Sequence, residues 1–85
     1  MTSLTNISVF FPSVNNTYDF SVPSNMSIKI VCSLIMKIMT EEYSGILNSS
    51  TLKHSLLVKK TGEMLNESLS LMQLGIRNGE HLIFV

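Results

Sequence analysis

The chain has 85 residues, and six basic side chains balance six acidic ones, so its formal net charge at pH 7 is zero. A chain of this length forms one small domain and buries too little surface to enclose a multi-residue catalytic cleft. Long-range attraction to nucleic acid or anionic lipid needs clustered positive charge, and the only adjacent cations are Lys59 and Lys60. The composition therefore disfavours nucleic-acid binding.

Two alternating segments at the start of the chain predict a β-hairpin. Residues 6–12 alternate, and the apolar side chains that share one face are Ile7, Val9 and Phe11. Phe10 falls on the opposite face. After an asparagine-rich turn the alternation returns, with a second inward set made of Tyr18, Phe20 and Val22. Pro23 ends the second strand, because proline cannot donate a hydrogen bond to a sheet.

A helix is predicted from Ile28 to about Tyr43, because the apolar spacing changes there to that of a helix. At about 100° per residue, one side of the helix is apolar and is expected to pack on the sheet; it holds Ile28, Val31, Cys32, Ile35, Ile38 and Met39. Ile30 and Leu34 lie on a flank outside this side. Their position predicts a contact with another molecule.

The second half of the chain predicts three short extended segments. Residues 46–53 form a serine-rich loop, in which Leu47 and Leu52 are expected to tuck under the domain. Residues 54–60 predict a strand, and residues 63–65 a short return after the turn at Gly62. A tight turn at residues 71–74 precedes a last strand with Leu82 and Phe84 inward. The order predicts an α+β fold, a single domain over residues 1–85 with a mixed sheet of four to five strands and one packed helix.

From about Ile7 to Val85 the chain resembles ubiquitin. The inward triplets of the hairpin match the opening strands of ubiquitin in number and spacing, and residues 22–28 (Val-Pro-Ser-Asn-Met-Ser-Ile) resemble the entry into its helix. Residues 55–58 (Ser-Leu-Leu-Val) resemble its Arg-Leu-Ile-Phe strand. The resemblance implies the ubiquitin-like β-grasp fold.

Within this superfamily the ending is similar to that of the YukD/EsaB-type proteins of bacterial type VII (ESX/WXG100) secretion systems. Their endings commonly read Gly-Ile-x-Asn-Gly-Asp/Glu-x-Leu-x-hydrophobic, a pattern that residues 75–84 reproduce. Part of this motif serves the fold, because glycine permits backbone angles that a side chain resists and Asn-Gly favours tight turns. The resemblance implies a cytoplasmic accessory or regulatory component of such a secretion system.

Catalytic and metal-binding residues are not expected. Cys32 has no partner for an internal disulfide, which fits a reducing compartment, and its apolar neighbours in sequence predict a buried, unreactive thiol. His54 and His81 could meet across paired strands, but two histidines without further ligands are inadequate for a metal site. No signal peptide or membrane-spanning segment is expected, and no cofactor.

The outward face of the sheet is the candidate protein-binding surface. Alternation places Leu57 outward if its neighbours point inward, and it places Ile83 and Val85 outward beside Leu82 and Phe84. By the resemblance, these three residues fall on the positions of ubiquitin's main recognition patch, which Phe10 would extend. The helix flank at Ile30 and Leu34 is a possible second surface, for a weak homodimer or for a larger secretion component.

These features predict a non-enzymatic, non-conjugating module that binds proteins. The sequence ends in Phe84-Val85 without the Gly-Gly tail that ubiquitin and the sulfur carriers activate. A sulfur carrier or conjugated modifier is therefore the disfavoured alternative, and a ubiquitin-like domain of a larger scaffold is a third possibility.

Overall fold

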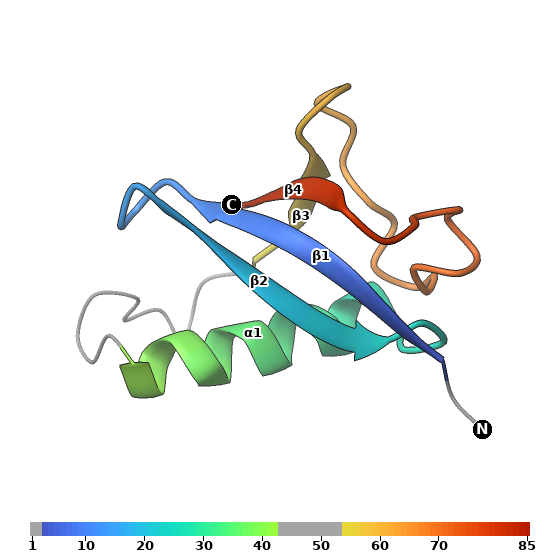
Figure 1. The fold of residues 1–85 in the computed structure, drawn as a ribbon, viewed down its shortest axis with the longest axis horizontal. Coiled ribbons are helices and arrows are strands. Elements are labelled where there is room, and N and C mark those ends of the chain that lie inside the picture. Colours follow the sequence, from blue (N-terminus) through green and yellow to red (C-terminus); the bar gives the residue numbers. More distant parts are fainter. Residues whose placement is uncertain (1–2, 43–53) are drawn as a thin grey trace.

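A four-stranded sheet arches over one helix in the computed structural model of the chain, which describes residues 3–42 and 54–85 (Figure 1). The predicted helix end at Tyr43 and the predicted tucking of Leu47 and Leu52 lie outside the described residues.

The opening hairpin is formed by β1 (Leu4–Phe11) and β2 (Asn16–Pro23), which pair antiparallel over their whole length. Its turn contains Asn15 with φ of 51°, a left-handed conformation that asparagine tolerates better than most residues. The inward triplet of β1 is fully buried, and the rings of Tyr18 and Phe20 pack edge-on against Phe11, with centroids 5.7 and 6.1 Å away. The predicted hairpin and its inward faces are confirmed.

The helix α1 (Ile28–Glu42) lies across the inner face of the sheet. Its first backbone N–H groups donate to the chain beyond β3, with Ile28 N to Leu69 O at 2.8 Å and Lys29 N to Glu67 O at 3.0 Å. Five of the six residues predicted for its inward side are buried: Ile28, Val31, Cys32, Ile35 and Met39. The helix and its face are therefore largely as predicted.

The prediction for Ile38 is wrong, because this side chain is 45% exposed. On a helical wheel Ile38 lies about 20° beyond Val31, away from the centre of the buried side. This difference in angle places Ile38 on the flank that holds Ile30 and Leu34.

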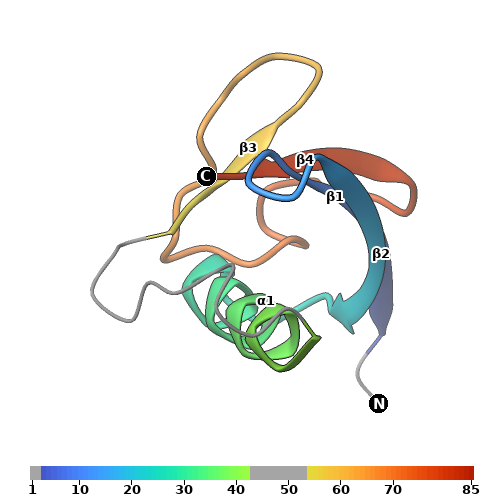
Figure 2. The ribbon, with the colours of Figure 1, turned by 90° about the vertical axis from the view of Figure 1, so that its left-hand side faces the viewer.

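The strands β3 (Leu56–Val58) and β4 (Glu80–Phe84) complete the sheet, whose order is β2-β1-β4-β3. β4 runs parallel to β1 and antiparallel to β3. This arrangement, with one helix covering one face, confirms the predicted β-grasp fold. Figure 2 shows the sheet curving around α1 from β3 on one side to β2 on the other.

β3 is shorter than the strand predicted over residues 54–60. The chain turns immediately after Val58, where Gly62 N donates to Val58 O at 2.7 Å and Gly62 has φ of +74°. The predicted return over residues 63–65 is a single bridge between Leu57 and Met64, not a strand. The tight turn bends the chain away before a ladder can extend.

The segment before β4 is held by side-chain hydrogen bonds. Ser70 and Gln73 cap each other's backbone, with Ser70 N donating to Gln73 Oε1 at 2.9 Å and Gln73 N to Ser70 Oγ at 3.2 Å. Asn78 Oδ1 then accepts a hydrogen bond from Asn6 N at 2.8 Å, next to Gly79 with φ of +88°. The Asn-Gly pair thus fixes the start of β4 against β1, which is the structural part of the C-terminal motif.

Candidate protein-binding surface

The outward residues of three strands form one apolar row across the sheet. The register pairs Phe10 of β1 with Ile83 of β4, and Ile83 with Leu57 of β3. Their neighbours Val9, Leu82 and Leu56 are completely buried beneath them, so alternation directs the row to the face opposite α1. Residues separated by tens of positions in the chain are therefore direct neighbours, a relation that the strand order of the sheet creates.

Two strongly exposed side chains enlarge this row. Met64 bridges to Leu57 and is 64% exposed, and Val85, two positions after Ile83, is 47% exposed. We call the set of five the outer-face patch: Phe10, Leu57, Met64, Ile83 and Val85. Sequence reasoning missed Met64, because its direction depends on the bridge to Leu57. Phe10, Leu57 and Ile83 are half-buried, since each covers part of its neighbours in the row.

A polar row runs beside the outer-face patch. Ser8 pairs with Asp19 on one side and with His81 on the other, and Lys59 N donates to His81 O at 3.0 Å. Asp19, His81 and Lys59 are exposed, whereas Ser8 is half-buried. An apolar centre with a charged and hydroxylic border is the usual anatomy of a protein-binding surface.

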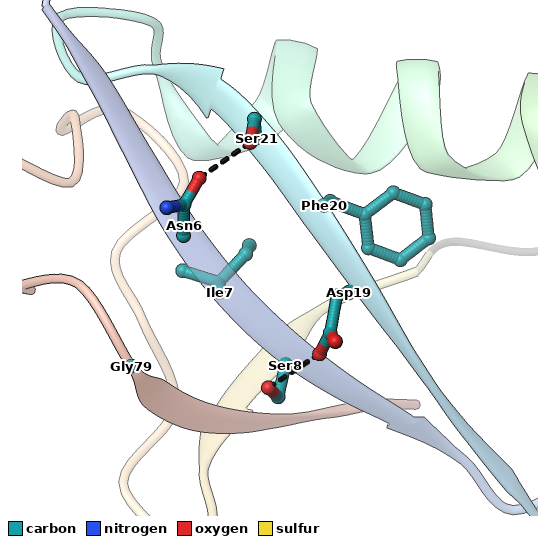
Figure 3. A pocket seen from close by; sticks show the side chains of 7 residues that line it. All are labelled: Asn6, Ile7, Ser8, Asp19, Phe20, Ser21 and Gly79. Carbon is teal, nitrogen blue, oxygen red and sulfur yellow. Dashed lines mark hydrogen bonds between the residues drawn. The ribbon is translucent and has the colours of Figure 1, made fainter.

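A shallow pocket of about 380 Å³ lies next to this border, over β1 and β2 (Figure 3). Its polar side chains bind one another, because Ser8 Oγ donates to Asp19 Oδ1 at 2.7 Å and Ser21 Oγ donates to Asn6 Oδ1. Ile7, Phe20 and Gly79 complete its lining. The pocket therefore holds paired groups and offers no converging set for a ligand.

The predicted second surface is also exposed. Ile30 is 51% exposed and Leu34 39%. Ile38, at 45%, continues them at the same four-residue spacing. We call these three residues the helix stripe. The structure keeps it apart from the outer-face patch, since the two lie on opposite layers of the fold.

The residues considered for chemistry are arranged for packing. Burial raises the pKa of the Cys32 thiol from 9.0 to about 11, and the negative charge of Glu67 adds to the rise. The His54 ring is half-buried and stacks on Phe84, with centroids 4.8 Å apart and planes 17° from parallel. Within residues 3–42 and 54–85, no three metal-ligating side chains cluster.

In the part of the chain that the structure describes, no helix combines the length and hydrophobicity that crossing a bilayer requires.

Solved structures with the same fold include domains of type VII secretion proteins. The EccD5 ubiquitin-like domain of Mycobacterium xenopi is similar with a TM-score of 0.73 and 13% identity, over 98% of this chain and 96% of that one. The ubiquitin-like domain of EccD1 from Mycobacterium tuberculosis gives 0.66 and 12%, over 98% of both chains. A chain of the ESX-5 inner membrane complex gives 0.77 and 11%, over 98% of this chain and 21% of that one. At these identities the likeness concerns the fold.

Comparison with curated protein sequences gives no match. A protein-family model does match, over residues 4–84, and its description is "WXG100 protein secretion system (Wss), protein YukD". The match includes all four strands, the helix and the Gly-Ile-x-Asn-Gly motif whose two glycines have positive φ. The chain therefore belongs to the YukD family, a ubiquitin-like family associated with type VII secretion.

Proposed function

We propose that this protein is a cytoplasmic, non-enzymatic component of a type VII secretion system, a single domain over residues 1–85 that acts by binding a protein partner through the outer-face patch. Family membership supports the secretion context. The structures of similar domains within secretion complexes, such as the ESX-5 inner membrane complex, support a protein partner.

The observation that carries the proposal is the row of Phe10, Ile83 and Leu57 on the face of the sheet opposite α1. Burying one large apolar side chain contributes about 1.5 to 3 kcal/mol before the cost of association. Three half-buried and two exposed side chains therefore suit reversible docking with a dissociation constant of about 1 µM. A patch this small does not suit a permanent complex.

The test is capture of secretion-system proteins by a tagged form of this chain in its own host. The wild-type protein is expected to retain a component of the secretion machinery. Ile83→Asp or Leu57→Asp is expected to lose it, because burying the new carboxylate in the interface costs free energy when no opposite charge pairs with it. Both positions are partly solvent-accessible, so the circular dichroism spectrum and the cooperative unfolding transition should be retained.

Met72→Asp is the matched control. Met72 is 60% exposed and lies in the turn whose backbone bonds to Ser24, at the opposite end of β1 from Phe10. This variant introduces the same charge in place of an exposed apolar side chain and should still capture the component. Equal capture by all the variants would contradict the proposal.

A further inference from the structure

The sheet has one edge that no described residue covers. β2 is the first strand in the order β2-β1-β4-β3, and it pairs only with β1 in the described part of the chain. The opposite edge, at β3, is partly closed by the bridge from Leu57 to Met64. With eight residues β2 is long for an edge strand, and a long uncovered edge is a template for pairing with another strand.

The hydrogen-bond pattern shows which groups of β2 face outward. Gly79 N donates to Asn6 O at 2.9 Å, so the backbone of Asn6 is turned toward β4. The next residue, Ile7, is then turned toward β2, and its partner Phe20 is turned back to β1. By alternation, Asp19 and Ser21 direct their N–H and C=O groups away from the sheet.

These two residues supply the donors of the edge. Thr17 N is already engaged by Asn16 Oδ1 at 3.2 Å, and Pro23 has no N–H group. The alternation turns the N–H groups of Asp19 and Ser21 away from β1, and outside the β1–β2 ladder no hydrogen bond between described residues engages them. A strand laid along β2 would therefore meet two donors, separated by one residue, and the carbonyl groups between and beside them.

The helix stripe lies on the same side of the molecule as this edge. Lys29 N donates to Glu67 O at 3.0 Å, so the segment that follows β3 lies against the start of α1, and Glu67 lies close enough to Cys32 for its charge to act on the thiol. The Cys32 side of α1 is therefore the β3 side. Ile30 and Leu34 are each two residues from Cys32, about 200° around the helix. The stripe therefore turns toward the β2 edge of the arch that Figure 2 shows.

We propose that the β2 edge and the helix stripe together accept an extended segment of a partner protein, which joins the sheet as an added strand. One face of that segment would carry apolar side chains toward Phe20 and the helix stripe. The other face would lie beside Asp19, whose carboxylate favours a lysine or arginine opposite it. The expected ligand is thus a strand of alternating apolar and polar residues with a basic residue on its polar face.

A second copy of this chain fits the edge less well. Antiparallel pairing of two β2 strands centred on Asp19 places the two Asp19 carboxylates side by side, and like charges directly opposite destabilise a sheet. A basic partner segment removes that repulsion. The site shares no residue with the outer-face patch, so the two proposals can fail separately.

The probe is a short synthetic peptide in which threonine and valine alternate and lysine replaces the central threonine. Titrated to about 1 mM into the isotopically labelled full chain, it should shift the amide NMR signals of Asp19, Ser21 and Leu34 and leave that of Ile83 unmoved. A second peptide with glutamate in place of lysine should bind more weakly.

Ser21→Pro and Ser21→Ala form the matched pair of variants. Both remove the hydroxyl that donates to Asn6, but only proline removes the outward N–H, and proline is tolerated on an edge strand. Ser21→Pro should weaken peptide binding about fivefold to tenfold relative to Ser21→Ala, the loss expected for one hydrogen bond of a ladder. Thermal unfolding of both variants checks that the hairpin still forms.

Two more variants test the chemistry of the site. Leu34→Asp should weaken binding of the lysine peptide, and Asp19→Lys should reverse the preference between the two peptides. Ile83→Asp should leave peptide binding unchanged.

Three outcomes would overturn the proposal. They are equal binding by Ser21→Pro and Ser21→Ala, shifts confined to Ile83 and Leu57, and no shift with either peptide. A fourth outcome, concentration-dependent shifts of Asp19 and Ser21 without peptide, would also overturn it, because a second copy would then occupy the edge.

Discussion

Cys32 illustrates how burial decides the chemistry of one side chain. It is 7% exposed on the inner side of α1, and its pKa is raised to about 11, first by loss of solvent and then by the charge of Glu67. At neutral pH the thiol stays protonated, and a protonated thiol is a poor nucleophile. The residue is therefore part of the core rather than a reactive group.

The raised pKa predicts a stability that falls at alkaline pH. Between pH 9.0 and about 11 the unfolded thiol loses its proton while the folded thiol keeps it. Its contribution to the free energy of unfolding is therefore complete below pH 9.0 and is lost as the pH rises toward 11. Urea titrations at pH 8 and pH 10.5 should show a larger decrease for the wild type than for Cys32→Ala. Equal decreases would contradict the assignment.

Gly79 shows a backbone requirement at the same scale. Its φ is +88°, and a Cβ atom placed there would have no neighbour within 4 Å, so the cost of a side chain is conformational and not steric. Gly79→Ala is expected to lower the free energy of unfolding by about 1 to 2 kcal/mol. Gly79→Asn should lower the free energy of unfolding by less than Gly79→Ala does, because asparagine tolerates positive φ. Denaturant unfolding of the two variants measures the difference.

The helix α1 shows how far an amphipathic pattern can be interpreted at the scale of an element. Its repeat predicted six inward residues, and the tertiary structure buries five of them. Ile38 was misplaced because the wheel gives only an angle, whereas burial at the margin of a face also depends on which part of the sheet lies opposite. Because Ile38 is exposed, the predicted flank of Ile30 and Leu34 becomes the three-residue helix stripe.

Truncations of neighbouring isoleucines test this division of the helix. Ile35 is 1% exposed and Ile38 is 45% exposed. Ile35→Ala should lower the free energy of unfolding by about 2 to 4 kcal/mol, because it leaves a cavity in the core. Ile38→Ala should lower it by less than about 1 kcal/mol. Chemical denaturation of both variants gives the comparison. Similar losses in the free energy of unfolding would contradict the assignment of Ile38 to the exposed flank.

At the scale of the whole molecule, low charge is the dominant physical property. Six positive and six negative side chains cancel, and the isoelectric point is about 6.7. Proteins near zero net charge repel one another weakly and associate more readily. We expect a solubility minimum near pH 6.7 and higher solubility at pH 9, measured by precipitation with polyethylene glycol. Ile83→Asp should raise solubility near neutral pH by adding charge to the outer-face patch.

Alternation and helical periodicity determined much of this protein from the sequence alone. They predicted the hairpin, the helix, the last strand and the inward side chains, because a strand and a helix each repeat with a fixed local period. They also gave the outward direction of Phe10, Leu57 and Ile83. The Gly-Ile-x-Asn-Gly motif indicated the family, because the residues that carry this resemblance lie close together in the chain.

Only the tertiary structure decided which of these elements became neighbours. The parallel pairing of β1 with β4 brings Phe10 beside Ile83, and the bridge to Leu57 adds Met64 to the outer-face patch. The same strand order leaves β2 at an edge beside the helix stripe. These relations depend on contacts between residues far apart in sequence, and a local repeat carries no information on which strand lies next to which.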